Sequence, residues 1–414
     1  MSRSQLGDDQ QTATAEPRRF VAPDEVVVGR GAVTEIGPRM VDRGSRALIV
    51  TTEGGRERHG ERVRESLKAA GLETVVYDAV TPDPTVATVE AGVDRYRTAD
   101  CDCLVALGGG SPIDAAKAVA VLAGEGGAIR EYATDRAGYE AVDGPLPPLG
   151  VVNTTAGTGS EATRSIVVTD EATATKFLVV ATAVVPAVAV EDPELVCSLP
   201  PSHTAFTGID AVTHAVEAYV STEAWALSDA PARAAIRRLA EWLPVAWTDG
   251  DNLGAREATL VGQLQAGQAF TNASVALVHG MARPLGARLK LPHGLANAVL
   301  LPTVVDYSTP GAPERYAEVT RLLGAADRDT PDQDAADQAA DALTSLCESV
   351  SVFGYLEEFG TVPDRATFAE WTSGMAKDAL ASGSPANNPR IPDQETIERL
   401  YLDVYDGVLA PHSA

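Results

Sequence analysis

The chain is poor in cysteine and has no long hydrophobic run. Four cysteines in 414 residues do not form a disulfide framework. No apolar stretch approaches the ~20 residues that a membrane-spanning helix needs, and the first residues lack the apolar centre of a secretory signal. We therefore interpret residues 1–19 as a polar tail and expect a soluble, cytoplasmic protein without a membrane partner.

Basic charge is also scarce. The 33 Lys and Arg residues stand against 58 Asp and Glu, and the formal net charge is −25. A nucleic acid would be repelled by this surface, so we exclude it as a partner. Only five basic residues are lysines, a composition typical of halophilic proteins, because molar salt screens the self-repulsion. The alternative is an ordinarily acidic protein from a G+C-rich genome.

Abundant hydrophobic residues, 45% of the chain, predict a large core divided between domains, since single cores stop growing near ~250–300 residues. Strand-like runs at 46–50, 74–77 and 103–107 alternate with helical patterns at 60–71, 84–97 and 112–123, which predicts a parallel sheet covered by helices. Helical spacing dominates beyond the prolines near 191–201. We predict an α/β dinucleotide-binding domain (20–195) and an all-α metal and substrate domain (196–414), with loops at 324–340 and 378–392.

Two loops rich in glycine and hydroxyl groups follow predicted strands. The first, GGGSPID at 108–114, allows backbone N–H groups to approach a phosphate, and the helix that follows favours an anion at its N-terminus. The second, TTAGTGSE at 154–161, comes after another strand, and ligands of open parallel sheets lie beyond such strand ends. Together the loops predict a nucleotide site. For either loop alone, a tight strand-to-helix turn is the alternative.

Histidines are few, and three of them together with one aspartate form a set of residues that suits a metal. Asp210 and His214 are four residues apart in a predicted helix, so their side chains share one face. Glu217 is placed to orient His214. His279 and His293 are fourteen residues apart, or ~21 Å along one unbroken helix. We expect the intervening Pro284, Gly286 and Pro292 to break that helix and bring both imidazoles together.

One carboxylate and three imidazoles suit Fe(II), Zn(II) or Mn(II). A nucleotide in the first domain and a metal in the second predict a cleft between them. If the nucleotide is a nicotinamide, the metal would act as a Lewis acid on the substrate oxygen during hydride transfer. For Asp210 and His214 taken alone, a helix-stabilising pair is the alternative.

Four segments resemble the iron-containing (group III) alcohol dehydrogenase family. They are GGGSPIDAAK at 108–117, TTAGTGSE at 154–161, GIDAVTHAVEAY at 208–219 and HGMARPLGARLKLPHG at 279–294. The resemblance extends from about residue 20 to 410. It implies a two-domain fold, NAD or NADP dependence and metal-assisted hydride transfer between the nicotinamide and a small alcohol or aldehyde, with Fe(II) preferred over Zn(II).

The resemblance also implies site residues. The metal ligands are Asp210, His214, His279 and His293. The cofactor contacts are Thr52, Asp83, Gly109, Gly110, Ser111, Asp114, Thr154, Thr155, Thr158 and Lys176. Phe270 matches an aromatic residue that borders the substrate pocket in lactaldehyde reductases, and plain core packing is its alternative.

The chain departs from the family pattern at two positions. Thr52 stands where NAD-preferring relatives often carry Asp, so a 2′-phosphate would not be repelled and Arg56 or Arg58 is placed to reach it. Arg283 replaces a histidine that many relatives carry, and an arginine cannot relay protons at neutral pH. Its guanidinium can instead hold a substrate carboxylate or phosphate, which favours acidic substrates.

Four other functions remain as alternatives. A maleylacetate reductase-like enzyme or a hydroxy-acid dehydrogenase would share the fold, and so would a dehydroquinate-synthase-like lyase, although the latter needs more basic residues for phosphate. A nucleotide-binding module without turnover would predict decay of one motif set, and both are intact.

Relatives are commonly dimers or larger, so we expect a homo-oligomer, with the apolar 26–28 segment as a candidate for pairing between subunits.

Overall fold

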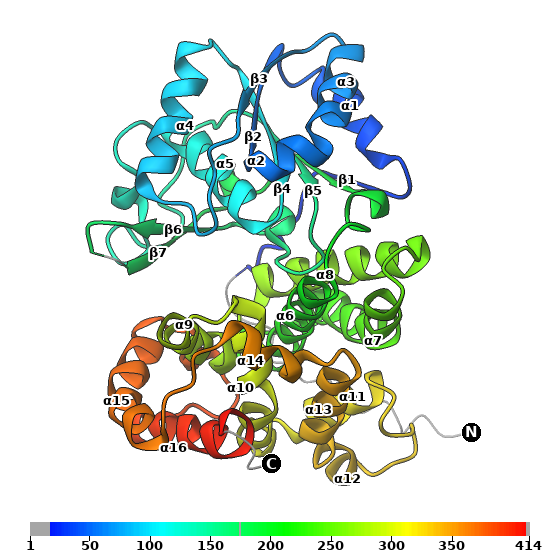
Figure 1. The fold of residues 1–414 in the computed structure, drawn as a ribbon, viewed down its shortest axis with the longest axis vertical. Coiled ribbons are helices and arrows are strands. Elements are labelled where there is room, and N and C mark those ends of the chain that lie inside the picture. The colour runs from blue at the N-terminus through cyan, green and yellow to red at the C-terminus, as the bar shows by residue number, and fades with distance from the viewer. Residues whose placement is uncertain (1–16, 174, 411–414) are drawn as a thin grey trace.

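The protein consists of a sheet-based part and a helical part, which lie one above the other along the longest axis of the molecule (Figure 1). A computed structural model describes residues 17–173 and 175–410, so most of the predicted polar tail lies outside the described residues. The sheet ends at Glu191 and the first long helix begins at Pro201. The predicted domain division at residue 195 falls between these points and stays a prediction.

Six parallel strands form one sheet in the order β1-β8-β5-β4-β2-β3. The predicted strands at 46–50, 74–77 and 103–107 are confirmed as β2, β3 and β4, and the predicted fold class is confirmed with them. The strands are β1 (Glu25–Val28), β2 (Arg46–Thr51), β3 (Glu73–Tyr77), β4 (Cys103–Gly108), β5 (Leu149–Asn153) and β8 (Val188–Glu191). The helices of this part are α1 (Ile36–Met40), α2 (Glu53–Gly55), α3 (Glu61–Ala69), α4 (Val86–Thr98) and α5 (Gly110–Gly124).

The strand order reverses between β2 and β4, because the chain moves from β2 outward to β3 and then returns to the other side of β2. Ligands of such sheets bind at the carboxyl ends of the strands that flank this switch point. Thr51 ends β2, and its hydroxyl donates to the carbonyl of Leu107 in β4 at 2.7 Å. Both predicted loops therefore begin at this edge of the sheet.

An antiparallel hairpin of β6 (Ser165–Asp170) and β7 (Thr175–Val180) was not predicted. In β6, Ile166 and Val168 are fully buried while Val167 is exposed. This alternation marks a strand with one covered face, but it lasts for too few residues to stand out in the sequence. The hairpin carries the predicted cofactor residue Lys176.

The second part is built of helices, as predicted. None of the helices in the described chain is long and apolar enough to cross a bilayer. The predicted loop at 324–340 is wrong in part, because α12 occupies its centre with Ala335 and Ala336 buried. The predicted loop at 378–392 begins inside a helix. The helices are α6 (Pro201–Val220), α7 (Ala226–Thr248), α8 (Leu253–Ala273), α9 (Leu277–Leu289), α10 (His293–Ser308), α11 (Pro313–Leu322), α12 (Asp332–Ala336), α13 (Ala339–Ser349), α14 (Leu356–Phe359), α15 (Arg365–Ala381) and α16 (Gln394–Val404).

The expected helix break between His279 and His293 occurs later than predicted. Helix α9 continues through Pro284 and Gly286 to Leu289, so these two residues do not end it. The fully buried side chains of Leu285 and Leu289 stabilise the helix past the proline. The chain turns only at Lys290, which has a positive φ of 57°, and at Pro292, and α10 then begins at His293 as predicted.

Candidate metal and nucleotide site

Helix α6 carries the first two predicted metal ligands. Pro201 opens the helix, a position that proline favours, and buried residues such as Ile209 and Val216 hold one face in the core. Asp210 and His214 lie one turn apart and are buried, with His214 Nε2 at 3.9 Å from Asp210 Oδ1. The predicted shared face is therefore confirmed.

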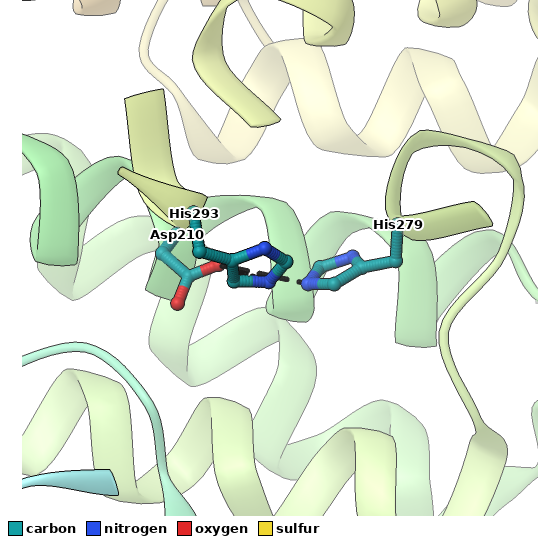
Figure 2. A group of neighbouring side chains, drawn as sticks. All are labelled: Asp210, His279 and His293. Atoms are coloured by element: carbon teal, nitrogen blue, oxygen red, sulfur yellow. Dashed lines mark ion pairs between the residues drawn. The ribbon is translucent and has the colours of Figure 1, made fainter. Parts of the chain in front are cut away.

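The turn between α9 and α10 brings the other two histidines to the same carboxylate. Nε2 of His279 and Nε2 of His293 lie 3.6 and 3.7 Å from Asp210 Oδ1. One ligand atom from each of Asp210, His279 and His293 lies within 4.8 Å of the others, and Figure 2 shows the three side chains directed toward one another. The imidazoles of His214 and His279 stack with centroids 4.5 Å apart.

Glu217 orients His279, and the prediction that it orients His214 was wrong. Its Oε2 lies 2.6 Å from His279 Nδ1, and its carboxylate also accepts the backbone N–H groups of Ala276 and Val278 at 2.9 and 2.5 Å. A carboxylate on one imidazole nitrogen directs the other nitrogen toward a metal. Glu217 therefore holds both the start of α9 and the direction of His279 Nε2.

The pKa values of the cluster determine how it can bind a cation. Burial lowers the pKa of His214 to about 3. Desolvation by the surrounding protein lowers the pKa of His293 to about 4, although about half of its side chain is exposed, so both imidazoles are neutral at pH 7. Burial acts in the same direction on His279, but the charges and hydrogen bonds of Glu217 and Asp210 together outweigh it and raise that pKa to about 9. Although burial opposes it, the surrounding imidazoles hold the pKa of Asp210 well below its ordinary value. A cation must therefore displace one proton from His279.

Two further residues border the cluster. The ring of Phe270 stacks on His214 with centroids 4.3 Å apart, so it adjoins the candidate metal ligands and also packs on the helical core. Asn297 was missed as a site residue. Its amide Nδ2 donates to Asp210 Oδ1 at 2.6 Å and lies 3.2 and 3.3 Å from Nε2 of His279 and His293. Its position one turn after His293 in a predicted helix was the available signal.

The glycine loop at the end of β4 forms a backbone cradle at the N-terminus of α5. A Cβ added at Gly109 would lie 2.7 Å from Thr155, and one at Gly110 would lie 3.2 Å from Thr158. The absence of side chains here lets the loops at 108–111 and 154–160 approach each other. Their backbone N–H groups and hydroxyls are suited to a pyrophosphate.

Three other predicted cofactor residues form one group beside this cradle. Lys176 Nζ pairs with Asp83 Oδ1 at 2.6 Å, and the backbone N–H of Asp83 donates to Ser111 Oγ at 3.2 Å. Both Asp83 and Lys176 are largely exposed. Their side chains are free to exchange this pair for contacts with a dinucleotide.

Three further residues predicted to contact the cofactor form hydrogen bonds to other residues of the protein. Thr52 accepts from the Gly55 N–H at 3.0 Å and caps α2. Thr154 donates its N–H to the Gly108 carbonyl at 3.2 Å and so joins the ends of β4 and β5. Asp114 is buried, and its Oδ2 accepts from the Val167 N–H at 3.0 Å. The structure thus favours a role for Asp114 in attaching the hairpin to α5, and its contact with the cofactor stays a prediction.

The nucleotide loops and the metal cluster face each other. The Gly157 backbone lies beside the imidazole of His214 and raises its pKa, against the larger effect of burial. The charges of Arg283 and Lys176 act on His293 and lower its pKa in addition to burial. Residues predicted separately for the cofactor, the metal and the substrate therefore meet at one place.

The residues present fit both implied groups. A carboxylate oxygen and imidazole nitrogens converge at a separation that a first-row divalent ion can bridge with bonds of about 2.0–2.2 Å. The glycine cradle would be filled by side chains at Gly109 or Gly110, as expected where a phosphate approaches the backbone.

Comparisons with known proteins agree with this arrangement. Residues 23–193 match the profile of iron-containing alcohol dehydrogenases, and residues 204–405 match the C-terminal part of the Fe-containing alcohol dehydrogenase family. The chain is 38% identical to 1,3-propanediol dehydrogenase of Klebsiella pneumoniae over 390 aligned residues. The aligned region covers 93% of this chain and 98% of that protein.

Solved structures give the same result. A 1,3-propanediol oxidoreductase has a TM-score of 0.88 at 37% identity, with coverage of 94% of this chain and 100% of that one. An archaeal halo-thermophilic alcohol dehydrogenase from a Red Sea brine pool has a TM-score of 0.85 at 27% identity, covering 95% and 100%. The chain belongs to the iron-containing alcohol dehydrogenase family.

Proposed function

We propose that the protein interconverts a small alcohol and its aldehyde or ketone, with NAD or NADP and one divalent cation, Fe(II) before Zn(II). Asp210, His214, His279 and His293 are the proposed ligands. The observation that carries the proposal is the approach of His279 and His293 Nε2 to Asp210 Oδ1 within 3.7 Å, from helices that face the nucleotide loops.

When bound, the metal supplies Lewis-acid polarisation of the substrate C–O group and the nicotinamide supplies or accepts the hydride. Glu217 keeps Nε2 of His279 directed at the ligand position through its contact with Nδ1. Phe270 covers one face of His214 and limits water there. Gly109, Gly110 and Ser111 would hold the pyrophosphate of the cofactor, and Asp83 and Lys176 would contact its ribose.

The choice between NAD and NADP depends on the end of β2. Thr52 itself places no carboxylate there, so this residue does not repel a 2′-phosphate. Arg56 is paired through Nε with Asp78 Oδ2 at 2.6 Å. Arg58, whose guanidinium adjoins Gly54, is the better placed of the two arginines to bind the phosphate.

Arg283 supports a preference for anionic substrates. It lies one turn after His279 on α9, its side chain is exposed, and the dense protein around it lowers its pKa by desolvation. Within the described residues it has no carboxylate within 4.0 Å. An uncompensated guanidinium beside the ligands suits a substrate carboxylate or phosphate.

The substitution Arg283→Ala is expected to raise KM for hydroxy-acid or phosphorylated substrates about tenfold or more, because hydrogen bonds to charged groups contribute about 1.5–3 kcal/mol. KM for neutral alcohols should change little. Steady-state kinetics on matched acidic and neutral substrates measures this difference, with Arg288→Ala on the last turn of α9 as control. An unchanged ranking of substrates would disprove the role of Arg283.

The acidic, lysine-poor composition supports a halophilic, cytoplasmic enzyme, and a halo-thermophilic structure is among its relatives. We also propose a homodimer or larger homo-oligomer. Strand β1 is at the edge of the sheet and exposes Val26 and Val28, which offers a surface for pairing.

The experiment that tests the proposed function combines metal analysis with a panel of substrates and cofactors in molar KCl. Protein reconstituted with Fe(II) or Zn(II) should retain about one ion per chain after dialysis and reduce an aldehyde with NADH or NADPH. Chelation should remove activity, and the same metal should restore it. Turnover that persists after complete removal of the metal would overturn the proposal.

A further inference from the structure

Two glutamates are completely buried behind the second nucleotide loop. Glu161 lies in a short 3-10 turn (Ser160–Ala162) and Glu191 is the last residue of β8, and both are 0% exposed. Neither residue contacts the candidate ligands, and the chemistry proposed above does not use them. Burying two carboxylates without compensation is strongly unfavourable.

Each carboxyl group has one partnered and one unpartnered oxygen. Oε1 of Glu161 accepts from Gln263 Nε2 at 2.7 Å, and Oε2 of Glu191 accepts from Asn153 Nδ2 at 2.9 Å. Oε2 of Glu161 and Oε1 of Glu191 are buried without a hydrogen-bond partner among the described residues. The charge of Glu161 acts on Glu191, which indicates that the two carboxyl groups are close. Both unpartnered oxygens are satisfied if one carboxyl group carries a proton and donates it to the other.

The charges of the surroundings require such a proton. On α5, the buried Lys117 is the cation that faces Glu161, and it already donates to the carbonyls of Ser160 and Thr163 at 2.7 Å. Its charge also acts on the buried carboxyl group of Asp114, where it opposes the larger effect of burial on the pKa. From β5 and α8 the neighbours are the neutral amides of Asn153 and Gln263.

The same conclusion follows from the acidity of the pair. Burial raises the pKa of Glu161 to about 6, and burial together with the charge of Glu161 raises the pKa of Glu191 well above its ordinary value. The adjacent Asp192 has different partners, the backbone N–H groups of Gly31 and Val33 at 3.2 Å. Asp192 is also paired with Arg62 at 3.4 Å.

The amides that bind this pair also hold the nucleotide loop. Asn153 Nδ2 donates to the Thr155 carbonyl at 2.7 Å, and Asn153 Oδ1 accepts from the Thr155 N–H at 3.1 Å. Gln263 Oε1 accepts from the Gly159 N–H at 2.8 Å. Because Asn153 belongs to β5 and Gln263 to α8, the start of the loop is attached to the sheet and its end to the helical part.

We propose that one proton shared between Glu161 and Glu191 holds the loop 154–160 in the conformation that binds the dinucleotide, which makes both glutamates positioning residues. Loss of that proton to solvent leaves two facing carboxylates, which repel and displace Asn153 and Gln263. The loop then loses the contacts that place Thr155 and Thr158 against the glycine cradle. The effect on cofactor binding rests on the proposed function, whereas the shared proton does not.

The proton also links folding to pH. An unfolded glutamate loses its proton near pH 4.3, whereas the folded pair keeps it to about pH 6 and above. Stability from this source is therefore complete below the unfolded pKa and is lost as pH rises through the folded values. The loop should weaken over the same range, and KM for the cofactor should rise up to about tenfold per pH unit above the pKa of the pair.

The test compares Glu191→Gln with Glu191→Leu in the full-length enzyme. Glutamine reproduces the protonated acid, because its oxygen can accept from Asn153 and its amide can donate to Glu161. We expect the midpoint of thermal unfolding and KM for the cofactor to become nearly independent of pH from 6 to 9 in Glu191→Gln. Glu191→Leu should raise KM at least about tenfold at every pH and leave kcat within about twofold. Glu171→Gln, an exposed residue, controls for the lost charge.

Infrared spectroscopy observes the proton directly, whether or not the enzyme turns over. The wild type should show the C=O stretching band of a buried carboxylic acid, and both Glu161→Gln and Glu191→Gln should lose it. Absence of that band, or the same pH dependence in the wild type and Glu191→Gln, would overturn the shared proton. If the band is present but the protein neither binds nor turns over NAD(P), the proposed function fails and the shared proton stands.

Discussion

Replacing His279 with alanine is expected to remove the bound metal and to lower kcat/KM by at least about a thousandfold. Its imidazole is buried, and Nε2 lies 3.6 Å from Asp210 Oδ1, at the centre of the ligand group. A metal contributes several kcal/mol to stabilising the charge that develops on an oxygen, and each 1.36 kcal/mol is a factor of ten in rate. Metal analysis after dialysis and steady-state kinetics measure the two effects.

Two further variants are compared with His279→Ala. His203→Ala removes an exposed imidazole from the first turn of α6 and should retain the metal and its activity. Glu217→Gln keeps the ligands but weakens the group that orients His279, and metal affinity should fall about 10–100-fold. A His279→Ala protein with its full metal content would show that the ligand assignment is wrong.

Gly294→Ala is expected to disrupt the metal site although Gly294 is not a ligand. A Cβ on Gly294 would overlap the backbone carbonyl of Phe206 in α6, so α10 would have to move away from the helix that carries Asp210. Overpacking of this kind costs about 1–3 kcal/mol, and the backbone at this contact cannot move as a flexible side chain can. We expect a loss of about 3 kcal/mol in the free energy of unfolding and at least a tenfold loss of metal affinity.

The control is Gly374→Ala in α15, where an added Cβ meets no atom within 4 Å. It should stabilise the protein slightly, because alanine is favoured over glycine in a helix by about 1 kcal/mol. Denaturant unfolding and equilibrium dialysis with Zn(II) compare the two variants. If Gly294→Ala binds metal as tightly as Gly374→Ala, the contact between α6 and α10 does not position His293.

Structural features that depend on residues close together in the sequence were predictable. The alternation of strands and helices before residue 195 identified the parallel sheet, because buried strands and crossover helices have distinct patterns of hydrophobic residues. The i, i+4 spacing of Asp210 and His214 was sufficient to place them together, since an α-helix fixes that relation locally. The glycines before α5 indicated the cradle for the same reason.

Relations between distant segments needed the tertiary structure. The sequence offered Pro284 as the helix break, yet packing of Leu285 and Leu289 carries α9 past it. Glu217 stands three residues from His214 but binds His279, because α9 begins beside the end of α6. The spacing of one helical turn from His293 was a local signal for Asn297 that was missed, whereas no motif indicated the pair of Glu161 and Glu191.

By itself, the sequence determined which chemical groups this protein has and which of them lie one helical turn or one tight loop apart. Only the tertiary structure decided that Nε2 of His279 and His293 approach the same carboxylate, and that two glutamates are completely buried behind the nucleotide loop. The reason is physical: backbone geometry sets neighbours within a turn, whereas neighbours between helices depend on how their buried faces pack.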